Sequence, residues 1–319
     1  MRHTDPLVAK RPHQAPWLGA FADKIAALSK DAPGLSPTQL VEALFEPCRV
    51  PSAGFFTGYY EPIIEARRSA EGPFQTPLYR RPAELTRTEP LSHLPGDGTF
   101  AKRLADGRLA PMPDRAAIEA GTLSGRGLEL AYVADPVDAF FAQVQGSARL
   151  RFADGSQVRI GYHGKTGHPY TAIGRVLIDQ GVLPEGGATM QTIRDALAAD
   201  PALVTPTLQA NRSFVFFRER ESAGPDLGPI AGGGVPLVPL RSLAVDRRFI
   251  ADGTPLFVET TLPGGAAFRR VMIAEDTGSA IIGPARGDIF FGSGAAAGSE
   301  AGDMKAAGRL TVFQPRWPT

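Results

Sequence analysis

The sequence contains a single cysteine, Cys48, and this scarcity excludes several kinds of site. One cysteine cannot form a disulfide within the chain, and it cannot build a zinc site whose ligands are all cysteines. A thiol enzyme is also disfavoured, because Cys48 lies in Phe-Glu-Pro-Cys-Arg-Val-Pro, where no nearby histidine would activate the thiol.

Long apolar runs and a surplus of charge are missing as well. No stretch approaches 20 consecutive apolar residues, so no transmembrane helix is predicted. Lys and Arg total 34 against 33 Asp and Glu, and the net charge of +1 gives no strong field for nucleic acid or a membrane surface. Residues 1–6 lack the apolar core of a signal peptide, which fits either a cytosolic protein or a mature form whose targeting segment was removed.

Glycine and proline are abundant, with 36 and 29 residues, and this favours turns and short strands. A chain of 319 residues, at about 150 residues per domain, predicts two domains. Apolar spacing predicts a helix from Trp17, a short helix from Ser36 to Phe45 and two helices within 171–199.

Strands are predicted in the remaining parts of the chain. Residues 54–61 form one strand, and residues 148–160 form a hairpin that turns at Asp154-Gly155. From Phe214 onward the pattern predicts only strands and turns. The combination indicates an α+β protein that is mainly β.

Two aspartates near the C-terminus are the strongest candidates for acid chemistry. Asp276 follows an apolar strand, and Asp288 precedes Ile289-Phe290-Phe291. A carboxyl group among apolar side chains is desolvated, which raises its pKa and helps it to act as an acid. Aspartates beside glycine also cap turns, and spacing alone favours that simpler role.

Tyr59, Tyr60 and Glu61 form a second candidate group at the end of the predicted strand. Paired tyrosines can stack on sugar rings, although ordinary packing is the commoner role. Glu61 is the natural rival of the aspartates for an acid role. The proline that follows it makes a turn an equally good interpretation.

Two further segments carry polar groups. Gln143-Val144-Gln145-Gly146-Ser147 is predicted to place two amides on one face of a strand, where they either bond sugar groups or line a solvated sheet. Residues 162–170 form a candidate binding loop. His163 and His168 are five residues apart, which does not match a helical zinc pair.

Other enzyme signatures are absent from the sequence. The glycine run in residues 231–236 lacks the Lys-Ser/Thr ending of a phosphate loop, and we interpret it as a flexible turn. No Gly-x-Ser-x-Gly motif indicates a serine hydrolase.

Several motifs occur in an order that resembles one family. They are Thr57-Gly58-Tyr59-Tyr60-Glu61-Pro62, the Gln143–Ser147 segment, Gly164-Lys165-Thr166-Gly167-His168-Pro169-Tyr170 and the C-terminal aspartate block. The chain resembles the membrane-bound lytic murein transglycosylase A family, which carries a C-terminal three-aspartate (3D) domain. The likeness extends from about residue 50 to the end of the chain.

The resemblance implies a fold and an arrangement of domains. The fold is a double-psi β-barrel built from both chain ends, residues 1–66 and 219–319, with a smaller β-rich domain inserted at 67–218. The glycan would lie in a groove between the two domains. The three aspartates map to Asp246, Asp276 and Asp288, and Asp303 lies outside the pattern.

The resemblance also implies the reaction. Lytic transglycosylases cleave the β-1,4 bond between N-acetylmuramic acid and N-acetylglucosamine without water and form a 1,6-anhydro product. Asp288 would be the single acid and base, with Asp276 beside it. No cofactor and no metal are implied.

The same resemblance implies the partners, location and binding residues. The partner is the peptidoglycan glycan strand, with other cell-wall enzymes as further candidates, and the location is the periplasm or the outer membrane. Candidate substrate-binding residues are Thr57, Gly58, Tyr59, Tyr60, Gln145, Gly146, Ser147, Lys165, Tyr170 and Asp246.

The sequence departs from the family at two points, and two alternatives stay open. Ser279 replaces a common second glycine, and no lipoprotein signal with a lipid-acceptor cysteine is visible at the start. One alternative is a hydrolytic muramidase that uses Asp276 and Asp288 as a water-activating pair. The other is a peptidoglycan-binding or assembly module without catalysis.

Overall fold

The structure is a computed structural model that describes residues 36–220, 224 and 227–316. The helix predicted from Trp17 lies outside the described residues. The chain divides into two compact units. The first comprises Met1–Tyr60, Ala223–Gly292 and Asp303–Thr319, and the second comprises Glu61–Ser222 and Ser293–Gly302.

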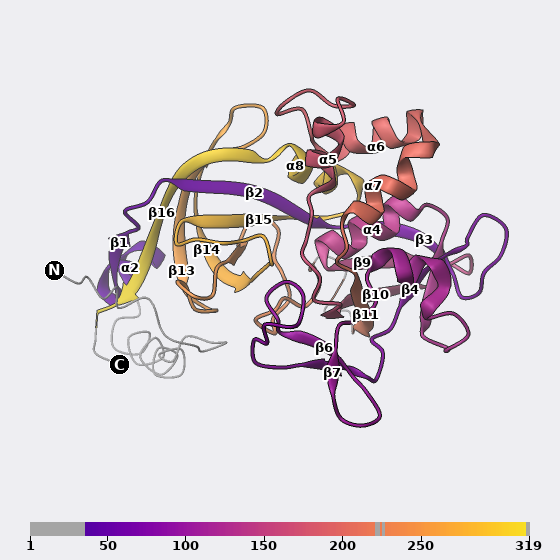
Figure 1. The fold of residues 1–319 in the computed structure, drawn as a ribbon. Coiled ribbons are helices and arrows are strands. Elements are labelled where there is room, and N and C mark those ends of the chain that lie inside the picture. Colours follow the sequence, from indigo (N-terminus) through magenta and orange to yellow (C-terminus); the bar gives the residue numbers. More distant parts are fainter. Residues whose placement is uncertain (1–35, 221–223, 225–226, 317–319) are drawn as a thin grey trace. The chain divides into compact units, whose positions relative to one another are not determined.

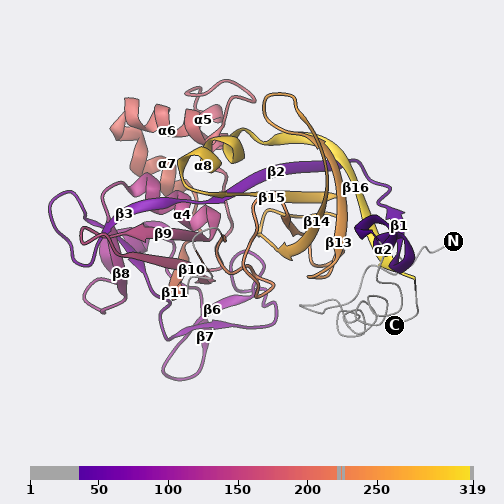
Figure 2. The same ribbon diagram turned by 180° about the vertical axis from the view of Figure 1, so that it is seen from behind.

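The first unit contains a closed barrel of six strands drawn from both ends of the chain. Its strands follow the order β16-β13-β14-β12-β15-β2, and β2 pairs back onto β16. Figure 1 and Figure 2 both show β2 beside β15 and β16. The strands are β2 (Gly54–Glu61), β12 (Ser242–Val245), β13 (Pro255–Thr261), β14 (Ala267–Asp276), β15 (Arg286–Ser293) and β16 (Lys305–Pro315).

Two shorter elements precede the barrel strands. Helix α2 (Pro37–Leu44) begins after Ser36, whose hydroxyl accepts a hydrogen bond from the Gln39 N–H while the Gln39 side chain bonds back to the Ser36 N–H. Strand β1 (Phe45–Arg49) then pairs with β16. The helix predicted from Ser36 is confirmed, although it ends at Leu44 and Phe45 already belongs to the strand.

Glycines allow the barrel wall to close around Phe56, whose side chain is fully buried. A Cβ atom on Gly287 would lie 2.9 Å from the Phe56 ring, and one on Gly308 would lie 2.3 Å from the Glu259 carbonyl oxygen. Neither position leaves room for a side chain. Gly287 directly precedes Asp288, so this close approach lies beside the candidate acid.

The second unit is built on a six-stranded sheet of order β11-β10-β9-β3-β8-β4 and a three-stranded sheet of order β5-β6-β7. The strands are β3 (Ile63–Arg67), β4 (Thr76–Tyr79), β5 (Leu85–Arg87), β6 (Phe100–Arg103), β7 (Leu109–Ala110), β8 (Glu129–Val133), β9 (Ser147–Arg151), β10 (Gln157–Lys165) and β11 (Val215–Arg220).

Helix α4 joins two apolar cores in this unit. Its residues Ala139 and Ala142 pack on the sheet, and Phe140 and Phe141 pack on α5, α6 and α7. The helices and helical turns are α3 (Arg115–Ala117), η1 (Ile118–Thr122), α4 (Pro136–Gln145), α5 (Ile173–Asp179), α6 (Met190–Ala199), η2 (Pro201–Leu203), α7 (Val204–Ala210) and α8 (Ala295–Asp303).

The structure confirms the main predictions of fold. It is mainly β, with a closed barrel built from both chain ends and a separate sheet domain. The hairpin is β9 and β10, with Arg151 opposite Gln157, and the two helices within 171–199 are α5 and α6. Among the helices of the described ranges, none has the length and apolar character needed to cross a membrane.

Two predictions of local structure are wrong. Gln143 and Gln145 lie in the last turn of α4 instead of on a strand, Gly146 ends the helix with φ of 76°, and Ser147 begins β9. The Asp135 cap and Pro136 start a helix whose apolar face includes two phenylalanines, and this outweighs the short polar pattern. Helix α8 was missed because its alanine-rich sequence also contains glycine and serine.

Candidate active site

Asp288 lies on β15, where it is paired with Ala244 of β12, and its carboxyl group is partly buried. The Thr57 hydroxyl, from β2, donates a hydrogen bond to its Oδ1 atom. Burial raises the pKa of Asp288 to about 6, against the opposing effects of Thr57 and Arg286 and with a further rise from Asp276. Asp288 therefore keeps a proton at pH values where an ordinary aspartate has lost it.

Asp276 is the last residue of β14 and is held by two donors. Its Oδ1 accepts a hydrogen bond from the Gly232 N–H at 2.9 Å, and its Oδ2 accepts one from the Tyr59 hydroxyl at 3.1 Å. Burial raises its pKa, although these hydrogen bonds oppose the rise. Burial and the charge of Asp276 also raise the pKa of Tyr59 well above its usual value, so this phenol stays a donor.

Arg286 connects β15 to β2 through several hydrogen bonds. Its Nη2 donates to Thr57 Oγ1 at 2.7 Å, and its Nη1 donates to the carbonyl oxygens of Phe55 at 3.3 Å and Gly287 at 2.5 Å. The guanidinium carbon lies 5.1 Å from the centre of the Phe55 ring. Burial lowers the pKa of Arg286, and the neighbouring Asp288 carboxylate opposes this.

Asp246, the third aspartate of the predicted set, has a different environment. Its carboxylate forms an ion pair with Arg248 and accepts a hydrogen bond from the Gly283 N–H at 2.8 Å. Burial favours a higher pKa for Asp246, but the bonds from Arg248 and Gly283 outweigh it and lower the pKa. Asp246 thus joins the segment after β12 to Gly283, and its predicted contact with substrate stays a prediction.

Glu61, the rival candidate, is fully buried in an ion-pair cluster of the second unit. Its carboxylate lies 2.6 Å from Arg159 Nε and 2.9 Å from Arg149 Nη2, and it accepts a hydrogen bond from the Ser293 hydroxyl at 2.6 Å. Two guanidinium groups compensate its charge. Glu61 is thus placed to stabilise structure and not to deliver a proton.

The other predicted binding residues are spread over both units. Tyr60 is buried and Gly58 is partly exposed on β2. In the second unit Gln145 is partly buried and Ser147 is buried, and the Gly146 carbonyl accepts a hydrogen bond from the Tyr162 N–H at 2.7 Å.

The segment of residues 162–170 is partly strand, since β10 extends to Lys165. The Lys165 ammonium lies 3.9 Å from Asp97 and 5.6 Å from the centre of the Phe100 ring. Tyr170 is exposed. His168 is buried and its Nε2 contacts the Met112 carbonyl at 2.8 Å. No three His, Cys, Asp or Glu side chains within the described ranges gather as metal ligands.

Sequence reasoning missed Arg286 and Gly232. Arg286 lies two residues before Asp288, and alternate residues of a strand share a face, so strand spacing could have indicated it. Gly232 belongs to the segment that we interpreted as a flexible turn, yet its N–H holds Asp276. No local signal distinguishes that N–H from those of the neighbouring glycines.

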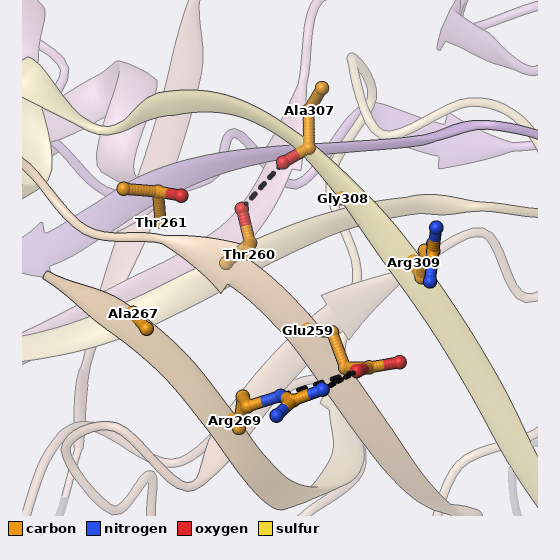
Figure 3. Close-up of a pocket in the computed structure, with 8 residues that line it drawn as sticks. All are labelled: Glu259, Thr260, Thr261, Ala267, Arg269, Ala307, Gly308 and Arg309. Carbon is orange, nitrogen blue, oxygen red and sulfur yellow. Dashed lines mark hydrogen bonds and ion pairs between the residues drawn. The ribbon is translucent and has the colours of Figure 1, made fainter. Parts of the chain in front are cut away.

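A shallow surface pocket of about 490 Å³ lies elsewhere on the first unit, on β13, β14 and β16. Figure 3 shows the Arg269 side chain pointing toward Glu259 and the Thr260 hydroxyl bonded to the Ala307 carbonyl. The Arg269 Nη2 atom lies 2.8 Å from Glu259 Oε1. None of the predicted site residues lines this pocket.

Comparison with known families and curated proteins gives consistent matches. Residues 55–218 match the MltA specific insert domain, and residues 241–314 match the 3D domain. The membrane-bound lytic murein transglycosylase A of Escherichia coli K12 is 38% identical over 268 residues, which cover 81% of this chain and 65% of that protein. The Vibrio cholerae enzyme of the same name is 34% identical over 264 residues, covering 80% and 64%. The chain thus spans somewhat less than two thirds of these relatives.

Solved structures support the same assignment. A membrane-bound lytic murein transglycosylase from Agrobacterium tumefaciens matches with a TM-score of 0.82 and 41% identity, covering 92% of this chain and 83% of that one. Escherichia coli MltA with bound chitohexaose matches with a TM-score of 0.71 and 31% identity, covering 96% and 93%. The resemblance inferred from the motifs is confirmed, and the chain belongs to the membrane-bound lytic murein transglycosylase A (MltA) family.

Proposed function

We propose that this protein is a lytic transglycosylase that cleaves the β-1,4 bond between N-acetylmuramic acid and N-acetylglucosamine in peptidoglycan without water. The proposal is supported by family membership and by the names of its relatives, which are lytic murein transglycosylases. One of them was solved with bound chitohexaose, itself a glycan.

The observation that carries the proposal is the environment of Asp288. Burial raises the pKa of Asp288 to about 6, and its Oδ1 atom accepts a hydrogen bond from the Thr57 hydroxyl. A carboxyl group of this kind can give a proton in its acid form and accept one in its base form near neutral pH. Both abilities are needed when a single side chain carries out the whole reaction.

The reaction requires two proton transfers. Protonated Asp288 gives its proton to the glycosidic oxygen as the bond from that oxygen to C1 of the muramyl sugar breaks. The resulting carboxylate accepts the proton of the C6 hydroxyl of the same sugar, whose oxygen bonds to C1. The products are a 1,6-anhydromuramyl end and a free C4 hydroxyl, and Asp288 regains its proton.

Asp276 has a supporting role in this proposal. Its charge raises the pKa of Asp288, so it opposes early ionisation of the acid. The same negative charge favours the oxocarbenium-like transition state of glycosidic cleavage. Gly232 and Tyr59 hold the carboxylate in place for both effects.

The substrate contacts and domain roles complete the proposal. We assign glycan binding to Thr57, Gly58, Tyr59 and Tyr60 on β2, to Asp246, and to Gln145, Gly146, Ser147, Lys165 and Tyr170 of the inserted domain. Residues 1–66 and 219–319 would form the catalytic domain, with residues 67–218 as the inserted domain. Peptidoglycan as substrate places the protein in the periplasm, where other cell-wall enzymes are candidate partners.

The test is the identity of the cleaved ends. Purified peptidoglycan is digested in ¹⁸O-labelled water with the native protein, with Asp288→Asn and with Asp303→Asn as a matched control, and the products are analysed by mass spectrometry. We expect 1,6-anhydromuramyl ends without ¹⁸O from the native protein and the control, and none from Asp288→Asn. Reducing ends that carry ¹⁸O would show a hydrolytic muramidase. Binding without any cleavage would show a non-catalytic module.

A further inference from the structure

Arg286 is the cation nearest to the candidate acid along β15, and it touches the acid's own hydrogen-bond partner. Its Nη2 lies 2.7 Å from Thr57 Oγ1, and the Thr57 hydroxyl is bonded to Asp288 Oδ1. Three side chains from two neighbouring strands therefore form one chain of hydrogen bonds.

The chemistry of the three side chains determines which group donates and which accepts in each of these hydrogen bonds. A guanidinium group can only donate hydrogen bonds, so Thr57 Oγ1 accepts from Arg286. A hydroxyl has a single proton, and with the arginine on one side the Thr57 proton points at Asp288 Oδ1. In the reverse arrangement the Thr57 proton would have no acceptor among the described residues.

The two oxygens of Asp288 consequently differ. Oδ1 accepts the Thr57 hydrogen bond, which disfavours a proton on that oxygen. No hydrogen bond between described residues ends on Oδ2. We propose that Arg286 is a positioning residue that, by fixing the direction of the Thr57 hydrogen bond, keeps the acid proton of Asp288 on Oδ2.

This inference rests on the proposed role of Asp288 as the acid. The proton on Oδ2 is then free for the glycosidic oxygen, and after transfer the same oxygen is free to accept the proton of the sugar's C6 hydroxyl. Without Arg286, water in its place can accept the Thr57 proton, so the hydroxyl is able to accept a hydrogen bond from Asp288, which can then direct its proton from Oδ1 to Thr57. Molecules in that state cannot protonate the substrate.

Among the described residues, three charged or titratable groups face Asp288. Arg286 lies on the same strand, Asp276 on β14 and the Tyr59 phenol on β2. Arg286 lowers the pKa of Asp288 and Asp276 raises it. Loss of Arg286 should therefore raise the pKa of Asp288 and move the alkaline limb of the pH–rate profile upward, which a purely structural role would not do.

The kinetic test is a double-mutant cycle on the full chain, with Arg286→Met, Thr57→Val and the double variant. Because each substitution removes a hydrogen bond that involves a charged group, each single variant should lower kcat about tenfold or more. The double variant should be no slower than Thr57→Val alone, because Arg286 acts through the hydroxyl. If the kcat loss of the double variant equals the product of the two single losses, the proposal is overturned. An Arg286→Met variant with native kcat would also overturn it.

Control variants separate positioning from folding. Arg286→Lys keeps a donor-only cation and should recover most of kcat, and Thr57→Ser keeps the hydroxyl. Arg241→Met removes the side chain of an exposed arginine of the same unit, whose guanidinium group donates to the Val271 carbonyl, and it should retain native activity. If Arg286→Met has lost its cooperative thermal unfolding, Arg286→Gln replaces it, since an amide oxygen can accept the Thr57 proton.

A second readout does not need activity. The carbonyl band of protonated Asp288 is isolated by infrared difference spectroscopy against Asp288→Asn. In the native protein Oδ1 accepts from Thr57, and in Arg286→Met the band should move to higher wavenumber. An unmoved band would show that Thr57 still donates, which contradicts the proposal. Inactive native protein with the expected band shift would reject the proposed function and leave the hydrogen-bond direction supported.

Discussion

Asp288 of the barrel is partly buried and Glu61 of the second unit is fully buried, and the two carboxyl groups have different partners. Glu61 is fully buried between two arginines, with its oxygens 2.6 Å and 2.9 Å from guanidinium nitrogens. Asp288 accepts a hydrogen bond from the Thr57 hydroxyl on one oxygen, and Arg286 bonds to that hydroxyl and not to the carboxyl group. Burial raises the pKa of Asp288 to about 6.

The difference shows that burial alone does not make an acid catalyst. A buried carboxylate that is paired with two guanidinium groups has its charge compensated, and it stabilises the fold only while all its partners are present. A buried carboxyl group without a direct ion pair avoids the desolvation cost of a charge by keeping its proton, and its pKa is therefore raised. The environment thus indicates a structural role for Glu61 and supports the proposed role of Asp288 as a proton donor.

The largest expected effect is on catalysis. Asp288→Asn removes the proposed acid and base, and general acid–base catalysis contributes about 10²–10⁴-fold, so we expect a loss of kcat of that size. The measurement is the rate of anhydromuropeptide release from purified peptidoglycan. Asp303→Asn, an exposed aspartate outside the motif, should keep the native rate. Comparable losses in both variants would contradict a special role for Asp288.

The structural role of Glu61 is tested by measuring the free energy of unfolding. Glu61→Gln leaves Arg149 and Arg159 without their carboxylate, and breaking a buried ion pair costs about 3 kcal/mol or more in the free energy of unfolding. Chemical denaturation measures this loss. Glu65→Gln, which breaks a pair with Arg151 that is about half exposed, is the matched control and should cost at most about 1 kcal/mol. Equal costs would show that Glu61 is not a structural ion pair.

A smaller effect concerns stability and pH. The folded-state pKa of Asp288, about 6, lies above the ordinary 3.8, so its contribution to stability is fully present below about pH 4 and is lost as pH rises through 6. Asparagine cannot ionise, so the variant does not lose stability in this pH range. Asp288→Asn should therefore be more stable than the native protein at pH 7, by about 1–2 kcal/mol once partial exposure is considered.

Thermal unfolding at pH 4 and pH 7 measures this effect. The difference between the two proteins should shrink at pH 4, where native Asp288 is protonated. If the native protein is more stable than Asp288→Asn at pH 7, the ionised Asp288 carboxylate does not destabilise the fold, and the raised pKa of Asp288 is contradicted.

The smallest expected effect is at the supporting carboxylate. Tyr59→Phe removes the hydrogen bond to Asp276 Oδ2 but keeps the ring that packs on Phe290. One such bond is worth about 1 kcal/mol, so kcat should fall less than about tenfold. Steady-state kinetics compare this variant with Tyr132→Phe, on β8 of the inserted unit. A loss as large as that of Asp288→Asn would make Tyr59 a catalytic group in its own right.

The sequence predicted more of the first unit, which contains the barrel, than of the second unit. Asp276 and Asp288 became candidates because each adjoins an apolar strand, and their roles stay predictions, whereas the hairpin is confirmed because Asp154-Gly155 is a specific turn signal. Gln145 was misplaced because a five-residue polar pattern does not show that the preceding residues form a helix. The apolar contacts of Phe140 and Phe141 with α5, α6 and α7 decide that, and they come from distant parts of the chain.

Long-range partners also determine the environments of the two acids. Glu61 meets Arg149, Arg159 and Ser293, which are 88 or more residues away in the sequence. Thr57 meets Asp288 across 231 residues. Local pattern can nominate a carboxyl group, but the charge of its neighbours depends on which strands pair.

The most direct test of this account is the titration of Asp288 itself. Infrared difference spectra between the native protein and Asp288→Asn, recorded from pH 3 to pH 9, follow the band of the protonated carboxyl group. We predict half-titration near pH 6, as the environment of Asp288 implies. Half-titration near the ordinary value of 3.8 would mean that Asp288 is ionised at neutral pH, and it would contradict the assignment of Asp288 as the proton donor.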